Sequence, residues 1–207
     1  MKSTAPHTKP AWLLLSSLFV TGCVTTGTTP SPVVGDGNVQ YGDAKAVEAV
    51  TNEFGSTDLQ MIAEDMTRSL LQSRVITESK SRPLITIAEV KNKTSEYIDT
   101  RSITDSIRTQ LGKSGAVRFA VDIPEMQNQT DELNRQSQSG LYKKNTSKKI
   151  GRMEGADYRL EGNIASIVKK SSSLKDVYYK FTLNLINIES GVLEWSDEKE
   201  IRKTSKR

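Results

Sequence analysis

The stretch VYYKFTLNLINI, residues 177–188, decides the fold of this 207-residue chain. Its side chains alternate, so that one face carries Tyr179, Phe181, Leu183 and Leu185 and the other carries Tyr178, Lys180, Thr182 and Asn184. A repeat of two residues predicts a β-strand, because successive side chains of a strand point to opposite faces of its sheet. We therefore expect the first face to lie in a hydrophobic core and the second to remain more polar.

The sequence on either side of this stretch predicts an antiparallel meander. Residues 189–191 form a three-residue loop ending in glycine, which suits a hairpin. Residues 192–201 return as a strand, with Leu193 and Trp195 predicted on one face, and the basic tail 202–207 is predicted to fray. Residues 157–168 also alternate, and one face holds Tyr158, Leu160, Gly162, Ile164, Ser166 and Val168.

Helices and strands alternate in the first part of the domain. Apolar side chains at three- and four-residue steps predict helices over 56–73 and 99–113. Gly112 and Gly115 are predicted to end the second helix, and capping signals predict that a third helix begins at Asp122. Short apolar runs predict strands over 46–55, 82–92 and 116–122. The fold class is therefore predicted as α+β. One domain over 41–207 is expected to hold a mixed β-sheet, packed by about three to four helices, with a C-terminal antiparallel meander.

A different kind of segment precedes this domain. Lys2, His7 and Lys9 stand before the apolar run 11–20, which is about half the ~20 residues that a membrane-spanning helix needs. A positive start, a short apolar run and small residues after it are typical of a secretory signal peptide, here expected over 1–22. Residues 23–40 are rich in Thr, Pro and Gly and are expected to form a flexible tether.

The only cysteine of the chain lies at the predicted cleavage point. The sequence Val20-Thr21-Gly22-Cys23 resembles the lipobox of bacterial lipoproteins, which implies cleavage before Cys23 and acylation, with palmitate among the chains. An ordinary signal peptide that contains a cysteine by chance is the alternative. Val24 stands where an Asp tends to retain enterobacterial lipoproteins at the inner membrane, so the resemblance implies the outer membrane, with the domain in the periplasm.

Loss of residues 1–22 removes most of the usual catalytic side chains. The single histidine, His7, leaves with the signal peptide, and Lys2 and Lys9 leave as well, which lowers the net charge of +4 by two. Without histidine and with Cys23 blocked, the mature chain cannot carry Ser-His-Asp or Cys-His catalysis, nor an ordinary zinc site. We expect no catalytic residue, no metal and no cofactor, and we interpret the paired carboxylates as solvated surface.

One stretch is strongly basic. Residues 133–153 contain no acid and carry Arg135, Lys143, Lys144, Lys148, Lys149 and Arg152, with Tyr142 between them. A nucleic-acid site would use such a pattern, but secretion makes nucleic acid an unsuitable partner. A solvated surface, or a contact with an acidic protein or an anionic glycan, remains open.

Several short segments, in this order and spacing, resemble the LpoB family of outer-membrane lipoproteins that activate a peptidoglycan synthase. They are the lipobox, FGSTDLQMIAEDM (54–66), NKTSEYIDT (92–100), SGAVRF (114–119), GADYRLEGNI (155–164) and NIESGVLEW (187–195). The resemblance implies a small mixed sheet with flanking helices and a role in cell-wall synthesis and cell shape without catalysis. It also implies a monomer that docks on the regulatory domain of a class A penicillin-binding protein.

The contact residues for that partner are predicted on three surfaces. The first is the loop that begins at Asn92, the second is the basic stretch 143–152, and the third is the exposed side of the last hairpin. The residues singled out are Asn92, Lys93, Thr94, Glu96, Tyr97, Lys143, Lys144, Lys148, Lys149 and Arg152.

The tether departs from the family pattern, because the well-known enterobacterial member has a much longer, proline-rich linker. About 17 residues span at most about 60 Å when fully extended. Two other functions therefore stay open. One is an accessory of an envelope or secretion assembly, since CsgG-like proteins have a similar periplasmic fold. The other is a carboxylate enzyme that cleaves glycan, which needs two carboxyl groups about 5–9.5 Å apart in one cleft.

Overall fold

The computed structural model describes residues 42–47 and 51–206. The chain divides into two units, Met1–Asp43 and Ala44–Arg207. The predicted signal peptide, Cys23 and the tether all lie outside the described residues. The following description concerns the second unit.

This unit contains a five-stranded mixed sheet and four helices. The elements are α1 (Ser56–Gln72), α2 (Arg74–Thr77), β1 (Leu84–Lys93), α3 (Thr100–Ser114), β2 (Arg118–Phe119), α4 (Ile123–Gln138), β3 (Tyr158–Lys170), β4 (Leu174–Asn187) and β5 (Leu193–Lys206). The strand order is β2-β1-β3-β4-β5. β1 is parallel to β2 and β3, whereas β3, β4 and β5 are antiparallel. The predicted α+β fold with a C-terminal meander is confirmed.

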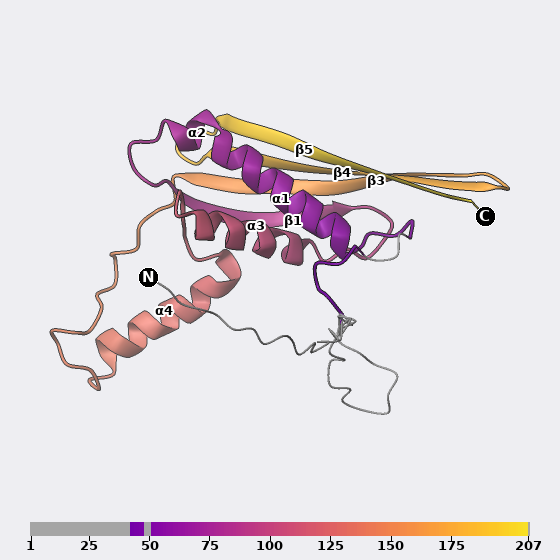
Figure 1. Cartoon of the computed structure of the whole chain (residues 1–207). Coiled ribbons are helices and arrows are strands. Elements are labelled where there is room, and N and C mark those ends of the chain that lie inside the picture. Colours follow the sequence, from indigo (N-terminus) through magenta and orange to yellow (C-terminus); the bar gives the residue numbers. More distant parts are fainter. Residues whose placement is uncertain (1–41, 48–50, 207) are drawn as a thin grey trace, which may run out of the picture. The chain divides into compact units, whose positions relative to one another are not determined.

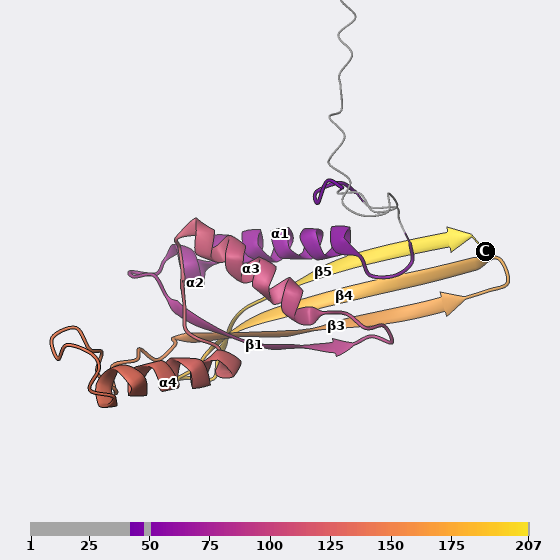
Figure 2. The ribbon, with the colours of Figure 1, turned by 90° about the horizontal axis from the view of Figure 1, so that it is seen from below.

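The helices α1 and α3 cover one face of the sheet (Figures 1 and 2). The predicted inward side chains of β4, together with Val177, are fully buried against them. The opposite face of β4 carries cross-strand polar pairs, such as Lys180 with Glu198 and Asn184 with Ser196. Among the residues that the structure describes, all core residues and the hydrophobic side chains packed on them lie between Phe54 and Ile201, so we expect the second unit to fold on its own.

The polar ends of α3 are formed by residues that the sequence singled out. Asp99 is the N-cap and accepts hydrogen bonds from the backbone N–H groups of Arg101 and Ser102. Gly115 ends the helix with φ of 69°, a left-handed conformation that glycine adopts easily. Gly112 lies inside α3, so the prediction that it helps to end the helix is wrong.

Three local predictions fail where partners distant in sequence decide the structure. The described parts of the predicted strand 46–55 form turns and coil, and residues 48–50 lie outside the described residues. The tail 202–207 does not fray up to Lys206, because β4 begins at Leu174 and gives it a pairing partner. A bulge at Glu194 pairs Leu193 with Ile186 and Trp195 with Leu185. Trp195 therefore packs on the core while Leu193 is exposed, and the two do not share a face.

The second unit has two distinct ends. Figures 1 and 2 show the β3–β4 hairpin extending past the helices at one end, and α4 with its following loop at the other. We call residues 139–153, which follow α4, the basic arm. Both ends matter for the surfaces described below.

Candidate partner-binding surfaces

The loop after β1 is closed by its own side chains. The Asn92 side-chain amide donates to the Glu96 carbonyl oxygen at 2.8 Å, and its Oδ1 accepts from the Thr94 backbone N–H at 2.9 Å. Asn92 and Lys93 belong to the end of β1, so the loop proper begins at Thr94. We call residues 94–99 the Glu96 loop.

Glu96 fastens this loop to the core. Both of its carboxylate oxygens lie 2.8 Å from the Tyr179 hydroxyl, and Oε2 also accepts from the Phe54 backbone N–H at 3.1 Å. Tyr179 is buried in β4, and burial, followed by the hydrogen bond to Glu96, raises the pKa of its hydroxyl well above the ordinary value. The carboxylate of Glu96 therefore faces inward and holds the loop in place.

The fixed loop presents Tyr97 to solvent. Ile98 is buried beneath it, whereas the side chain of Tyr97 is 95% exposed. An exposed aromatic side chain on a loop of fixed backbone is of the kind enriched at binding surfaces. Tyr97 is thus the member of the loop best placed to reach a partner.

A groove of about 730 Å³ runs beside Tyr97. Its walls come from the second half of β1, the Glu96 loop, the first turns of α3 and the start of α4, where Ile123 is 88% exposed. Arg101 pairs with Glu125, and Arg108 pairs with Asp122, so two ion pairs join α3 to the first turn of α4. Asp122 stands at the N-cap position, but it uses its carboxylate for Arg108 and makes no side-chain cap.

The groove also bears on the enzyme hypothesis. Three carboxyl groups line it, those of Glu89, Asp99 and Asp122. Asp99 caps α3, and hydrogen bonds from Ser102 hold its pKa below the ordinary value. A general acid in glycan cleavage needs a raised pKa, so Asp99 does not suit that role.

Beyond the two ion pairs that join its first turn to α3, helix α4 extends away from the core. The part of α4 whose side chains the structure describes contains no buried residue. Its far end is held instead by the basic arm, because the Ser147 hydroxyl donates to the Gln136 carbonyl oxygen at 2.6 Å and the Lys148 backbone N–H donates to Gln136 Oε1 at 3.2 Å. Helix and arm thus form one projecting unit.

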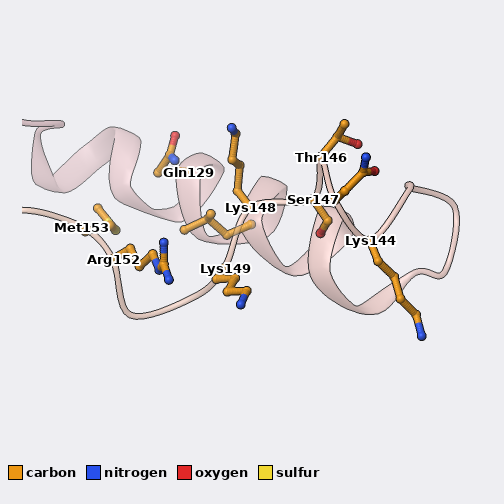
Figure 3. Close-up of a pocket in the computed structure, with 10 residues that line it drawn as sticks. Gln129, Lys144, Thr146, Ser147, Lys148, Lys149, Arg152 and Met153 are labelled. Atoms are coloured by element: carbon orange, nitrogen blue, oxygen red, sulfur yellow. The ribbon is translucent and has the colours of Figure 1, made fainter.

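A shallow pocket of about 560 Å³ lies between α4 and the basic arm. Four of the five predicted lysines and arginines of the arm line it, namely Lys144, Lys148, Lys149 and Arg152, while Lys143 lies next to them in the sequence. Figure 3 shows these side chains spread along the arm beside Gln129 and Met153. Such spread cations suit an extended acidic surface better than one small anion.

These cations are available for a partner. Within residues 42–47 and 51–206, none of the five forms an ion pair. Arg135, in contrast, forms an ion pair with Glu132, and its guanidinium carbon Cζ lies 5.3 Å from the centre of the Tyr142 ring. The basic stretch therefore divides into one arginine that supports the arm and five exposed cations.

The structure places the predicted loop near the start of α4 and the predicted basic stretch near its far end. Ile123 at the start of the helix borders the groove, and Gln129 and Leu133 farther along border the basic pocket. Sequence reasoning missed these α4 residues, because the few apolar side chains of the helix resemble those of an ordinary surface helix. The third predicted surface, the outer side of the last hairpin, is occupied largely by cross-strand pairs.

Two negative findings concern the described residues. In this part of the chain, no group of three or more His, Cys, Asp or Glu side chains is arranged to hold a metal ion. None of the described helices combines the length and apolar character required to span a membrane.

The fold and these surfaces define a small α+β domain suited to contact with a partner. Residues 58–201 match the model of the peptidoglycan-synthase activator LpoB family. The chain therefore belongs to the LpoB family, whose name describes a regulatory role in peptidoglycan synthesis.

Solved structures similar to this chain include members of that family. The LpoB C-terminal domains from Salmonella enterica and Escherichia coli are each 16% identical to it, cover 70% of this chain and 98% of their own, and give TM-scores of 0.43 and 0.41. Lipoprotein GNA1162 from Neisseria meningitidis is 15% identical, covers 59% of this chain and 84% of its own, and gives a TM-score of 0.39. No curated protein matches the chain significantly.

Proposed function

We propose that this protein is a non-catalytic lipoprotein of the outer membrane that binds and activates a class A penicillin-binding protein. Its signal peptide ends at residue 22, Cys23 carries the lipid, and residues 23–40 tether the periplasmic domain. Membership of the peptidoglycan-synthase activator family supports the regulatory part of this proposal. The lipobox sequence supports the anchor.

The contact with the synthase uses both sides of α4. Tyr97 and Ile123 are exposed apolar anchors beside the groove, and the basic arm supplies unpaired cations for an acidic surface of the regulatory domain. Aromatic anchors typically dominate the affinity of an interface, while charges set its orientation and association rate. The unpaired cations of the arm, together with the exposed ring of Tyr97, are the observations that carry this assignment.

The test uses the mature chain without lipid, residues 24–207, and the cognate synthase in detergent. The wild-type chain should pull down the synthase and raise its glycan polymerisation and cross-linking. The double variant Lys148→Glu/Lys149→Glu should lose most of this stimulation, because two attractive charges become repulsive. The matched control is Lys170→Glu/Lys206→Glu, which changes the net charge equally at the other end of the domain and should stimulate normally.

The outcomes are distinct. No stimulation by the wild-type chain would contradict the proposed function. Stimulation that both double variants retain would keep the function and remove the basic arm from the contact. We expect a monomer in sedimentation velocity at micromolar concentration, and a stable oligomer would instead favour the assembly accessory.

A further inference from the structure

The tip of the β3–β4 hairpin combines apolar and basic side chains. We define the hairpin tip as residues 167–175 together with Lys206 of β5, which pairs with Leu174 of β4. Ile167 and Leu174 are 59% and 40% exposed. The sequence of the tip contains no acid, and Lys169, Lys170 and Lys206 are exposed.

The nearest acid is already neutralised. Asp176 receives hydrogen bonds from the Arg202 guanidinium, at 3.0 Å from Nε and 2.6 Å from Nη2, and these hold its pKa below the ordinary value. Lys170 and Lys206 have no ion-pair partner within the described ranges. The tip therefore carries two lysines without an ion-pair partner, Lys170 and Lys206, together with the exposed apolar side chains of Ile167 and Leu174.

The N-terminal connection of the domain reaches the same end. The side-chain amide of Asn52 lies 3.3 Å from the Lys203 carbonyl oxygen, and the Ser205 hydroxyl bonds to Asn52 Oδ1. Asn52, which precedes α1, thus lies beside the C-terminal end of β5. In Figures 1 and 2 the α4 end, with the basic arm, lies at the opposite end of the sheet.

We propose that the hairpin tip docks on an anionic phospholipid bilayer. This inference rests on the proposed anchor at Cys23, which keeps the domain close to such a surface. Binding to a membrane surface strengthens with the apolar area inserted and with the attraction of lysines to anionic headgroups, and the tip offers both. Docking in this way directs the basic arm away from the membrane, toward the side where a synthase would approach.

The experiment measures binding of the unlipidated chain 24–207 to vesicles by co-sedimentation at low ionic strength. Vesicles of phosphatidylglycerol and phosphatidylethanolamine should bind the chain, and vesicles of phosphatidylcholine alone should not. Lys170→Glu/Lys206→Glu should weaken binding about 30-fold or more, since each lysine near an anionic surface contributes about fivefold. Lys148→Glu/Lys149→Glu, with the same change in net charge, should weaken binding less than about threefold.

A second pair of variants tests the apolar part and does not alter charge. Ile167→Ser/Leu174→Ser should weaken vesicle binding about tenfold, because two partly exposed side chains no longer enter the interface. Leu141→Ser/Ile150→Ser on the basic arm is the matched control and should bind as the wild type does. Circular dichroism and the thermal midpoint of each variant verify that it is folded, and Lys170→Gln/Lys206→Gln replaces the reversal variant if that one unfolds.

Each result decides between the alternatives. Failure of the wild-type chain to bind anionic vesicles, or equal losses from the tip and arm variants, would overturn the docking proposal. Vesicle binding with the expected variant pattern, but without stimulation of the synthase in detergent, would retain docking and contradict the proposed function. If the tip variants stimulate the synthase normally, the surface that docks on the membrane is distinct from the surface that contacts the synthase.

Discussion

At the scale of single residues, the bond between Glu96 and Tyr179 links the core to the candidate binding surface. The hydroxyl comes from the buried face of β4, and the carboxylate comes from the loop that presents Tyr97. A loop held in one conformation before binding loses less conformational freedom when a partner arrives. The affinity for a partner should therefore depend on residues that never touch it.

Tyr179→Phe should lower the free energy of unfolding by about 1–3 kcal/mol at pH 7, because Glu96 loses its buried donor. The measurement is urea unfolding followed by circular dichroism. Because the folded-state pKa of Tyr179 is raised, its contribution is complete below its unfolded pKa of about 10 and is lost as the pH rises above it. The difference between wild type and variant should then shrink above pH ~10. Tyr97→Ala is the control and should change stability by less than about 0.5 kcal/mol.

Asp65→Asn tests a pair that joins α1 to β5. The hydrogen bond from Lys199 lowers the pKa of Asp65 from its ordinary 3.8, so the stabilisation is present above that pH and is lost as the pH falls through the folded-state pKa. The variant should be less stable by about 1 kcal/mol or less at neutral pH, as for partly exposed pairs, and the difference should disappear in acid. Urea titrations at neutral and acidic pH measure this, and a constant difference would contradict it. Glu64→Gln, on the exposed side of α1, should change little.

At the scale of elements, the close approach of β3 to β4 depends on one glycine. A Cβ added to Gly162 would lie 2.2 Å from the Thr182 carbonyl oxygen, which is part of the backbone and cannot turn aside. Gly162→Ala should therefore cost about 3 kcal/mol or more by strand displacement. Gly112→Ala in α3 is the control, because nothing lies within 4 Å of its added Cβ, and it should stabilise the domain by about 0.5–1 kcal/mol. Thermal unfolding compares the two, and equal effects would contradict the argument.

The elements that could be predicted from sequence are those whose own pattern of apolar and polar residues determines whether they form a helix or a strand. The period of α1 and the alternation of β4 needed no knowledge of neighbours, because the buried side chains of each lie on one face. β3 also alternates, although only Leu160 and Ile164 of its inward face are buried. The bulge at Glu194 and the pairing of β5 up to Lys206 depend on the register with β4, which no local pattern of β5 reveals.

The candidate surfaces show the same limit. The sequence pointed to the Glu96 loop and the basic stretch, but it could not separate Glu96, which faces the core, from Tyr97, which faces solvent. The distinction depends on Tyr179, 83 residues from Glu96 in sequence. The role of α4 between both surfaces was equally hidden, because its few apolar residues resemble an ordinary surface helix.

At the scale of the whole molecule, every core residue in the part of the chain that the structure describes belongs to the second unit. A chain of residues 44–207 should unfold at the same temperature as the chain 24–207, within about 2 °C. Truncation after residue 200 should instead lower the midpoint by about 10 °C or more, since burial of Ile201 and the end of β5 are lost. Differential scanning calorimetry measures both. A large effect of the first truncation, or none of the second, would contradict this division.

The ion pair between Asp58 and Lys203 joins residues 145 positions apart, the first turn of the first helix and the end of the last strand. The ribosome synthesises α1 long before β5, so α1 can pack against β5 only when synthesis of the chain is almost complete. The domain therefore cannot close its core during synthesis, and contacts of such long range also slow folding afterwards. The order of the elements along the chain itself therefore postpones folding of the domain until the last strand has been made.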